Sequence, residues 1–131
     1  MSAASRNKGK VGERELAALL TEITGFHVRR RVRQHDGDSD LEGVPGWSIE
    51  CKRYASATPA VIEGWWHQTV TQARQSKTLP VLFYRVDRGP WLAVWPSGLH
   101  PPERRPVPVE FSDTLSADPT VWWRMAQHIL R

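Results

Sequence analysis

The chain has 131 residues, enough for one folded domain, and its 40% hydrophobic and 24% charged residues exclude a disordered or low-complexity protein. Lys and Arg outnumber Asp and Glu by 18 to 14, which permits a polyanionic partner, and no stretch approaches the roughly 20 apolar residues of a membrane span. The one cysteine, Cys51, excludes an intrachain disulfide and a cysteine-based zinc site, and predicts a reducing, cytoplasmic location.

The first half of the chain predicts one helix and then three strands. Leucines and an isoleucine at helical spacing predict the helix, with Gly25 ending it and a basic, flexible lead-in before it. Alternating apolar and polar residues predict the strands, the last two of which form a hairpin. The expected elements are the lead-in at 6–10, the helix over 12–24, and strands over 26–33, 40–41 and 47–53.

The second half predicts a helix, two strands, a proline-rich segment and a final helix. Thr58 and Pro59 have the character of an N-cap and first helical residue, and Asp118 and Pro119 repeat that signal. The expected elements are a helix ending near Lys77, strands over 80–86 and 91–95, an extended segment over 96–108, an edge strand at Val109 and Phe111, and the last helix after 119. One mixed β-sheet flanked by helices, an α/β fold, accommodates this order.

Three side chains around the predicted hairpin carry the chemistry. Glu50 and Lys52 are two residues apart on a strand and share a face, while Asp40 on the partner strand can lie opposite Glu50. Two neighbouring carboxylates repel unless a cation lies between them, and hard oxygen ligands suit Mg²⁺, with Mn²⁺ as a substitute. A lysine beside the metal can hold a water or stabilise charge on a phosphate. A solvated face of an edge strand, with Asp40 in the turn, is the alternative.

The first predicted helix offers two further acids. Helical geometry places Glu13 slightly nearer than Glu15 to the apolar stripe, so Glu13 is favoured to lean over the sheet. The alternative is that these acids complement the helix dipole in a first turn.

Basic residues lie close to the acids in sequence. Three arginines share one face of the strand over 26–33 without an interleaved acid, a pattern that suits a phosphate backbone, although a solvated face is the alternative. Two glutamines four apart on the second helix could contact phosphate or the lysine, or be ordinary helix-edge residues. The predicted DNA-binding residues are Lys8, Lys10, Arg29, Arg31, Arg33, Arg53, Gln68 and Gln72.

Tryptophans occur in adjacent pairs on two of the predicted helices. Trp65 and Trp66, and likewise Trp122 and Trp123, exceed what a small sheet covers if both members are buried. We expect them either to build a dimer interface or to form a core in which the last helix docks on the second.

These features together resemble the PD-(D/E)xK nuclease superfamily, more closely the archaeal-type Holliday junction resolvases, and small resolvase-like nucleases of phages and prophages. The resemblance rests on a Lys-Gly lead-in with a Glu-Arg-Glu helix start, an Asp-Leu pair and an Ile-Glu-x-Lys strand, and it covers residues 8–95. Its carriers are residues 8–15, 33–34, 36–47, 49–52, 65–68 and 80–85.

The resemblance implies a restriction-endonuclease-like core over residues 1–95, with 96–131 as an extension packed on the same domain. It implies that Asp40, Glu50 and the Cys51 main-chain carbonyl hold Mg²⁺, that Lys52 positions water or stabilises charge, and that Glu13 is an auxiliary acid. It further implies a homodimer that cuts branched DNA. Because a fold does not fix a substrate, a restriction-like, nicking or flap-cutting nuclease and a non-catalytic DNA-binding module stay open as alternatives.

Overall fold

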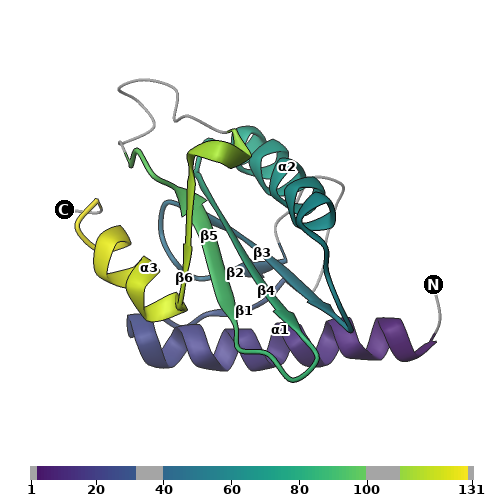
Figure 1. Cartoon of the computed structure of the whole chain (residues 1–131). Helices are drawn as coiled ribbons and strands as arrows, with labels where there is room; N and C mark the ends of the chain where they lie inside the picture. The colour runs from purple at the N-terminus through teal and green to yellow at the C-terminus, as the bar shows by residue number, and fades with distance from the viewer. Residues whose placement is uncertain (1–2, 32–39, 100–109, 130–131) are drawn as a thin grey trace.

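The computed structural model describes residues 3–31, 40–99 and 110–129, which form one six-stranded sheet with helices on both faces (Figure 1). The sheet has the order β1-β2-β3-β4-β5-β6, with β3 and β4 parallel and every other pair antiparallel. The elements are the helices α1 (Ala3–Thr24), α2 (Pro59–Ser76) and α3 (Pro119–Ala126), the 3-10 helix η1 (Phe111–Asp113), and the strands β1 (Arg29–Arg30), β2 (Leu41–Glu42), β3 (Trp47–Tyr54), β4 (Leu79–Val86), β5 (Leu92–Pro96) and β6 (Thr114–Ala117).

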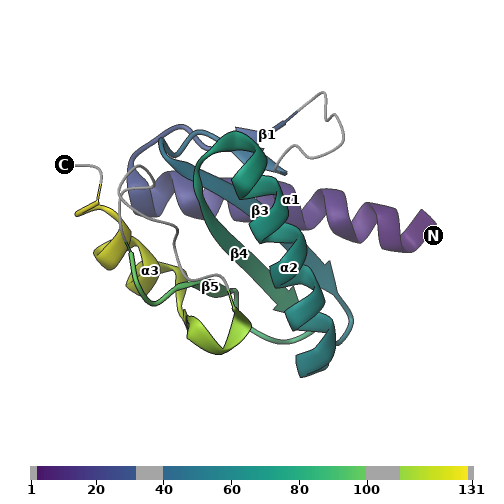
Figure 2. The same cartoon turned by 90° about the horizontal axis from the view of Figure 1, so that it is seen from above.

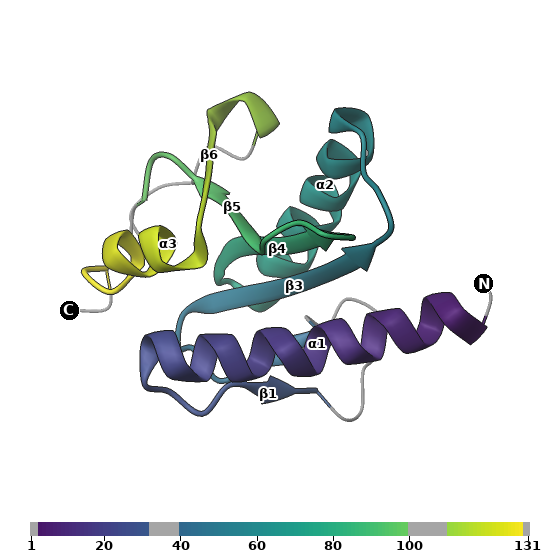
Figure 3. The same ribbon diagram turned by 60° about the horizontal axis from the view of Figure 1, so that its bottom comes forward.

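Helices α1 and α3 pack on one face of the sheet and α2 on the other. Figure 3 shows β3 between α1 and α2, and Figure 2 shows α2 crossing over β3 and β4. The core under α1 and α3 contains Ile49, Phe83 and Trp122, and the smaller core under α2 contains Trp66 and Leu82. Alternate residues of β3 therefore belong to opposite faces of the sheet.

The predicted mixed α/β fold is confirmed, and so are the hairpin and the second helix. Leu41 pairs with Ile49 across the hairpin. The Thr58 side chain accepts a hydrogen bond from the Val61 amide, and Lys77 ends α2 in the left-handed region at φ 57°. The terminal amides and carbonyls of a helix have no hydrogen-bond partner within the helix, and capping residues supply one. Such residues therefore mark the ends of a helix in the sequence.

Two predictions about the first half of the chain are wrong. The basic segment 6–10 is not a flexible lead-in, because α1 begins at Ala3 and includes it. Hydrophobic periodicity marks only the part of a helix that packs on the sheet, so it missed this polar extension. The strand predicted over 26–33 is reduced to Arg29–Arg30 in the described residues, because its partner β2 has only two residues. Phe26 instead packs edge-on against Trp123, with ring centroids 6.1 Å apart.

The predicted edge strand at Val109 and Phe111 is also misplaced. Phe111 begins η1 and packs against the core under α2, and the edge strand is β6, which pairs with β5. Val109 and most of the proline-rich segment lie outside the described residues.

One tryptophan of each pair lies in the core, and the other members, Trp65 and Trp123, are half-buried. Trp66 and Trp122 are fully buried, which rules both out of a dimer interface. Trp122 packs edge-on against Trp47 and Phe83, at centroid distances of 5.3 and 5.1 Å. The last helix docks on α1 and β5 instead of on the second helix, because α2 lies on the other side of the sheet.

Candidate active site

Glu50 is a buried acid in the middle of β3. Its side chain is 2% exposed, and β3 is buried from Trp47 to Cys51. The strand is flanked by β2 and β4 and covered by helices on both faces, which excludes the alternative of a solvated edge strand. Lys52 lies two residues further along the same face, and its ammonium nitrogen is 3.6 Å from Glu50 Oε1.

Asp40 stands immediately before β2 and is held against β3 by main-chain hydrogen bonds. Its amide donates to the Ile49 carbonyl at 3.1 Å. Its carboxylate oxygen Oδ2 accepts from the Cys51 amide at 2.9 Å. The acid thus lies beside the strand that carries Glu50 and Lys52, as the hairpin predicted.

The environment of Glu50 disfavours the charged form of its carboxyl. Burial first, and then the neighbouring Asp40 carboxylate, raise the pKa of Glu50 to about 9, while Lys52 acts in the opposite direction. Glu50 Oε2 is buried and has no hydrogen-bond partner in the described part of the chain. Such a buried acceptor is costly unless a cation or a donor satisfies it. Two hard carboxylate oxygens with one open acceptor fit a divalent cation of the Mg²⁺ type.

Of the two acids on α1, Glu13 is the one near Cys51 of β3, and α1 packs on the face of β3 opposite to Glu50 and Lys52. Glu13 is close enough that its charge contributes to raising the pKa of the Cys51 thiol, and its Oε2 is 2.7 Å from Arg30 Nε. Glu15 is instead engaged by Arg85 and by the indole nitrogen of Trp91 at 2.7 Å. The helix-dipole alternative is wrong for both acids, because α1 begins at Ala3 and neither residue is in its first turn.

The predicted arginine stripe is partly neutralised. Glu42 on β2 lies 3.3 Å from Arg29 Nε and 3.2 Å from Arg31 Nη1. No acid lies between the arginines in the sequence, and the acid that pairs with them comes from the neighbouring strand. Arg33 lies outside the described residues.

A second group of predicted DNA-binding residues meets at Asp87, in the turn after β4. Lys8 Nζ and Arg53 Nη1 lie 3.1 and 2.8 Å from Asp87 Oδ1. Hydrogen bonds from Arg53 and Lys8 hold the pKa of the Asp87 carboxyl below its usual value. Sequence reasoning missed Asp87 because a turn acid after a strand has no distinguishing pattern. Lys10 is exposed and forms no ion pair within the described ranges.

The two predicted glutamines of α2 differ from each other. Gln68 is exposed, whereas Gln72 is half-buried, with an Oε1 that finds no donor among the residues described. The ion-pair partner of Lys52 is Glu50 and not a glutamine.

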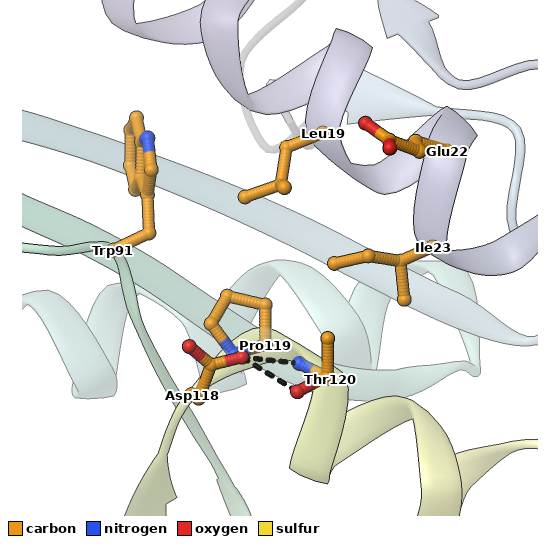
Figure 4. A pocket seen from close by; sticks show the side chains of 7 residues that line it. All are labelled: Leu19, Glu22, Ile23, Trp91, Asp118, Pro119 and Thr120. Carbon is orange, nitrogen blue, oxygen red and sulfur yellow. Dashed lines mark hydrogen bonds between the residues drawn. The ribbon is translucent and has the colours of Figure 1, made fainter.

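Two pockets of the described residues lie away from this site. One pocket lies between α1 and the start of α3, and none of the predicted site residues lines it (Figure 4). Its lining residues are Leu19, Glu22, Ile23, Trp91, Asp118, Pro119 and Thr120. Within residues 3–31, 40–99 and 110–129, no three His, Cys, Asp or Glu side chains form a metal-binding cluster. Among these residues, a cation at this place would have the two carboxylates of Asp40 and Glu50 to bind.

Comparison with known proteins assigns the family. Residues 4–100 match the model of the family described as "Phage putative PDDEXK endonuclease", and the chain belongs to that family. Protein D14 of Escherichia phage T5 is 28% identical over 113 residues, which cover 70% of this chain and 71% of that protein. The solved structure of Hjc, a Holliday junction resolvase from Archaeoglobus fulgidus, is similar with a TM-score of 0.49 and 19% identity, covering 88% of this chain and 87% of Hjc.

Among the described residues, no helix combines the length and the apolar character that crossing a membrane requires.

Proposed function

We propose that the protein is a divalent-metal-dependent DNA endonuclease that acts on branched DNA, with the four-way junction as its main substrate. The single observation that carries the metal dependence is the buried carboxyl of Glu50, whose pKa is raised by burial and by the neighbouring Asp40 although Lys52 lies 3.6 Å away. A binding module without catalysis would gain nothing from such a group, because burying an acid is unfavourable and acids repel DNA.

In this proposal, each residue of the site has a distinct role. Asp40, Glu50 and the Cys51 main-chain carbonyl hold the cation, which is Mg²⁺ or, as a substitute, Mn²⁺. When bound, the metal supplies charge neutralisation for the scissile phosphate and lowers the pKa of a water molecule. Lys52 orients the attacking water or stabilises charge that builds on the phosphate oxygens. Glu13 acts as an auxiliary acid beside the metal and reaches the site from α1.

DNA binding involves the basic residues around this edge of the sheet. Lys10 is exposed, and Lys8 and Arg53 exchange Asp87 for phosphate at little cost, because exposed ion pairs are weak. Arg29, Arg31, Arg33, Gln68 and Gln72 complete the proposed surface. A homodimer acting inside the cell would place two such sites on the two strands of a junction.

The test is cleavage of a synthetic four-way junction and of a linear duplex of the same sequence, each with Mg²⁺ and with EDTA. We expect metal-dependent cutting of the junction, and a loss of about 100-fold or more in Asp40→Asn and Glu50→Gln. Glu22→Gln is the matched control, because this acid lies on α1 at the separate pocket.

Each outcome separates the alternatives. Preference for the linear duplex would reject the junction as substrate and favour a restriction-like, nicking or flap-cutting nuclease. Undiminished cutting by Glu50→Gln would reject the site. Absence of both cutting and Mg²⁺ binding by calorimetry would favour a non-catalytic DNA-binding module.

A further inference from the structure

An exposed aromatic ring lies next to the candidate active site. Tyr54 ends β3, two residues beyond Lys52, and therefore has its side chain on the same face of the strand. Two residues of a strand span about 7 Å. The ring of Tyr54 stacks on Trp65 of α2 with centroids 5.0 Å apart and planes at 27°, and Trp65 in turn contacts Tyr84 at 6.0 Å.

The arrangement of this pair is unlike that of the core aromatics. Tyr54 is 40% exposed, although its partner Trp65 is half-buried and supported by Tyr84. Among the described residues, Trp65 is the one aromatic partner of Tyr54. Because the two rings are nearly parallel, Trp65 covers one face of the tyrosine ring, and Tyr54 nevertheless stays 40% exposed. A flat, rigidly supported ring that faces solvent suits a planar partner.

We propose that the Tyr54–Trp65 pair is a stacking platform for an unpaired base of the DNA substrate, beside the phosphate that is cut. This inference rests on the proposed function and names its substrate class: DNA with an unstacked nucleotide at the cleavage site. Bases inside a duplex already stack on one another, so the platform is available only to a base that has left the stack. Cationic residues near aromatic rings are the usual combination for such binding, and Arg53 and Lys8 lie at this end of β3.

Charge and position favour a nucleobase over a protein partner. Lys52 precedes Tyr54 on the same face of β3, so a cation lies on this face of the strand together with the aromatic residues Trp65 and Tyr84. Stacking needs no hydrogen-bond readout, so the platform selects an unpaired base of any sequence.

The experiment measures binding without cleavage, in EDTA, with the full chain. The probes are a fluorescein-labelled duplex with a short single-stranded tail and the blunt duplex of the same sequence. We expect Tyr54→Ala to weaken binding of the tailed duplex by about 5- to 150-fold, since stacking contributes about 1–3 kcal/mol per base. Binding of the blunt duplex should stay within about twofold. Tyr54→Phe keeps the ring and should keep the affinity.

Phe26→Ala is the matched control. Phe26 is 37% exposed and also rests on a tryptophan, but it does so edge-on and at the other end of α1. We expect it to change neither affinity. Equal weakening of both probes by Tyr54→Ala, or of neither, would overturn the platform. A Tyr54→Ala protein that sediments as a smaller species than the wild type would also overturn it, by assigning the ring to an interface between copies.

These results are independent of the proposed catalysis. A protein that binds the tailed probe through Tyr54 but cuts no DNA with Mg²⁺ would reject the nuclease function and retain the platform. If the Tyr54→Ala variant cuts junctions as fast as the wild type and binds both probes normally, the platform is rejected and the nuclease function is retained.

Discussion

Asp40 and Cys51 are joined by a hydrogen bond of 2.9 Å from the Cys51 amide to the Asp40 carboxylate. The bond ties an acid that precedes β2 to the strand between Glu50 and Lys52. The Asp40 amide also donates a hydrogen bond to the Ile49 carbonyl. Main-chain groups of β3 thus hold both the backbone and the carboxylate of Asp40. Asp40 is therefore positioned by backbone geometry, before any ligand is bound.

Glu50→Gln should stabilise the metal-free protein while abolishing cleavage. At about pH 8 the folded wild type keeps Glu50 largely protonated, because its pKa of about 9 lies well above that of the unfolded chain, and a permanently neutral amide avoids this cost, which is of the order of a few kcal/mol. Thermal unfolding in EDTA at about pH 8 is the measurement. A melting temperature lower than that of the wild type would contradict the assignment of Glu50 as an uncompensated acid.

The pH dependence of the same comparison has a definite sign. The pKa of Glu50 rises from an ordinary value of 4.5 to about 9, so the folded wild type binds more protons than the unfolded chain between these values. The free energy of unfolding of the metal-free wild type should therefore fall as pH rises through this window, and the advantage of Glu50→Gln should grow. Addition of Mg²⁺ should raise the melting temperature of the wild type and leave that of Glu50→Gln unchanged.

Lys52→Met should reduce kcat by about 100-fold or more with little change in KM, if Lys52 acts on the water or on the developing charge. Because Lys52 is not a proposed metal ligand, the Mg²⁺-induced rise in melting temperature should persist in this variant. Loss of that rise would assign Lys52 to cation binding through Glu50 instead. Lys52→Arg keeps the charge but changes its geometry, and should restore only part of the rate.

Glu42→Gln should strengthen binding to DNA. The change removes the carboxylate that lies beside both Arg29 and Arg31 and competes with phosphates for them. The slope of log K against log salt should steepen by about 0.9 for each added phosphate contact. Glu63→Gln makes the same charge change on α2, where the acid is exposed beside His67, and serves as the control. Equal effects of the two variants would show that net charge, and not the two arginines, is responsible.

Gly43→Ala should destabilise the fold by about 1–3 kcal/mol. Gly43 has φ +129°, and an added Cβ would lie 2.3 Å from the His27 carbonyl oxygen, a backbone atom that cannot yield easily. Gly64 on α2 is the contrasting position, since a Cβ added there would meet nothing within 4 Å. Gly64→Ala should therefore stabilise α2 by about 0.5–1 kcal/mol. Urea unfolding of both variants measures the difference, and similar stabilities would contradict it.

The sequence predicted those elements that have local signals. The caps of α2 and α3 and the run of strand-forming residues in β4 located these elements within a few residues. The juxtaposition of Asp40 with β3 followed from the short hairpin. Contacts between distant segments left no such signal: the pairing of Glu42 with Arg29 and Arg31, the convergence of Lys8 and Arg53 on Asp87, and the docking of α3 on α1 depend on tertiary packing.

The buried thiol of Cys51 gives this strand an internal reporter. Burial, with the charges of Asp40 and Glu13 adding to it, raises the pKa of the thiol well above its usual value, so alkylating reagents meet little thiolate. The chain has no other cysteine. The rate at which iodoacetamide labels the native protein therefore measures how often α1 separates locally from β3 at Cys51. Cys51 lies between Glu50 and Lys52 in the sequence, so this rate reports on local opening beside the candidate active site.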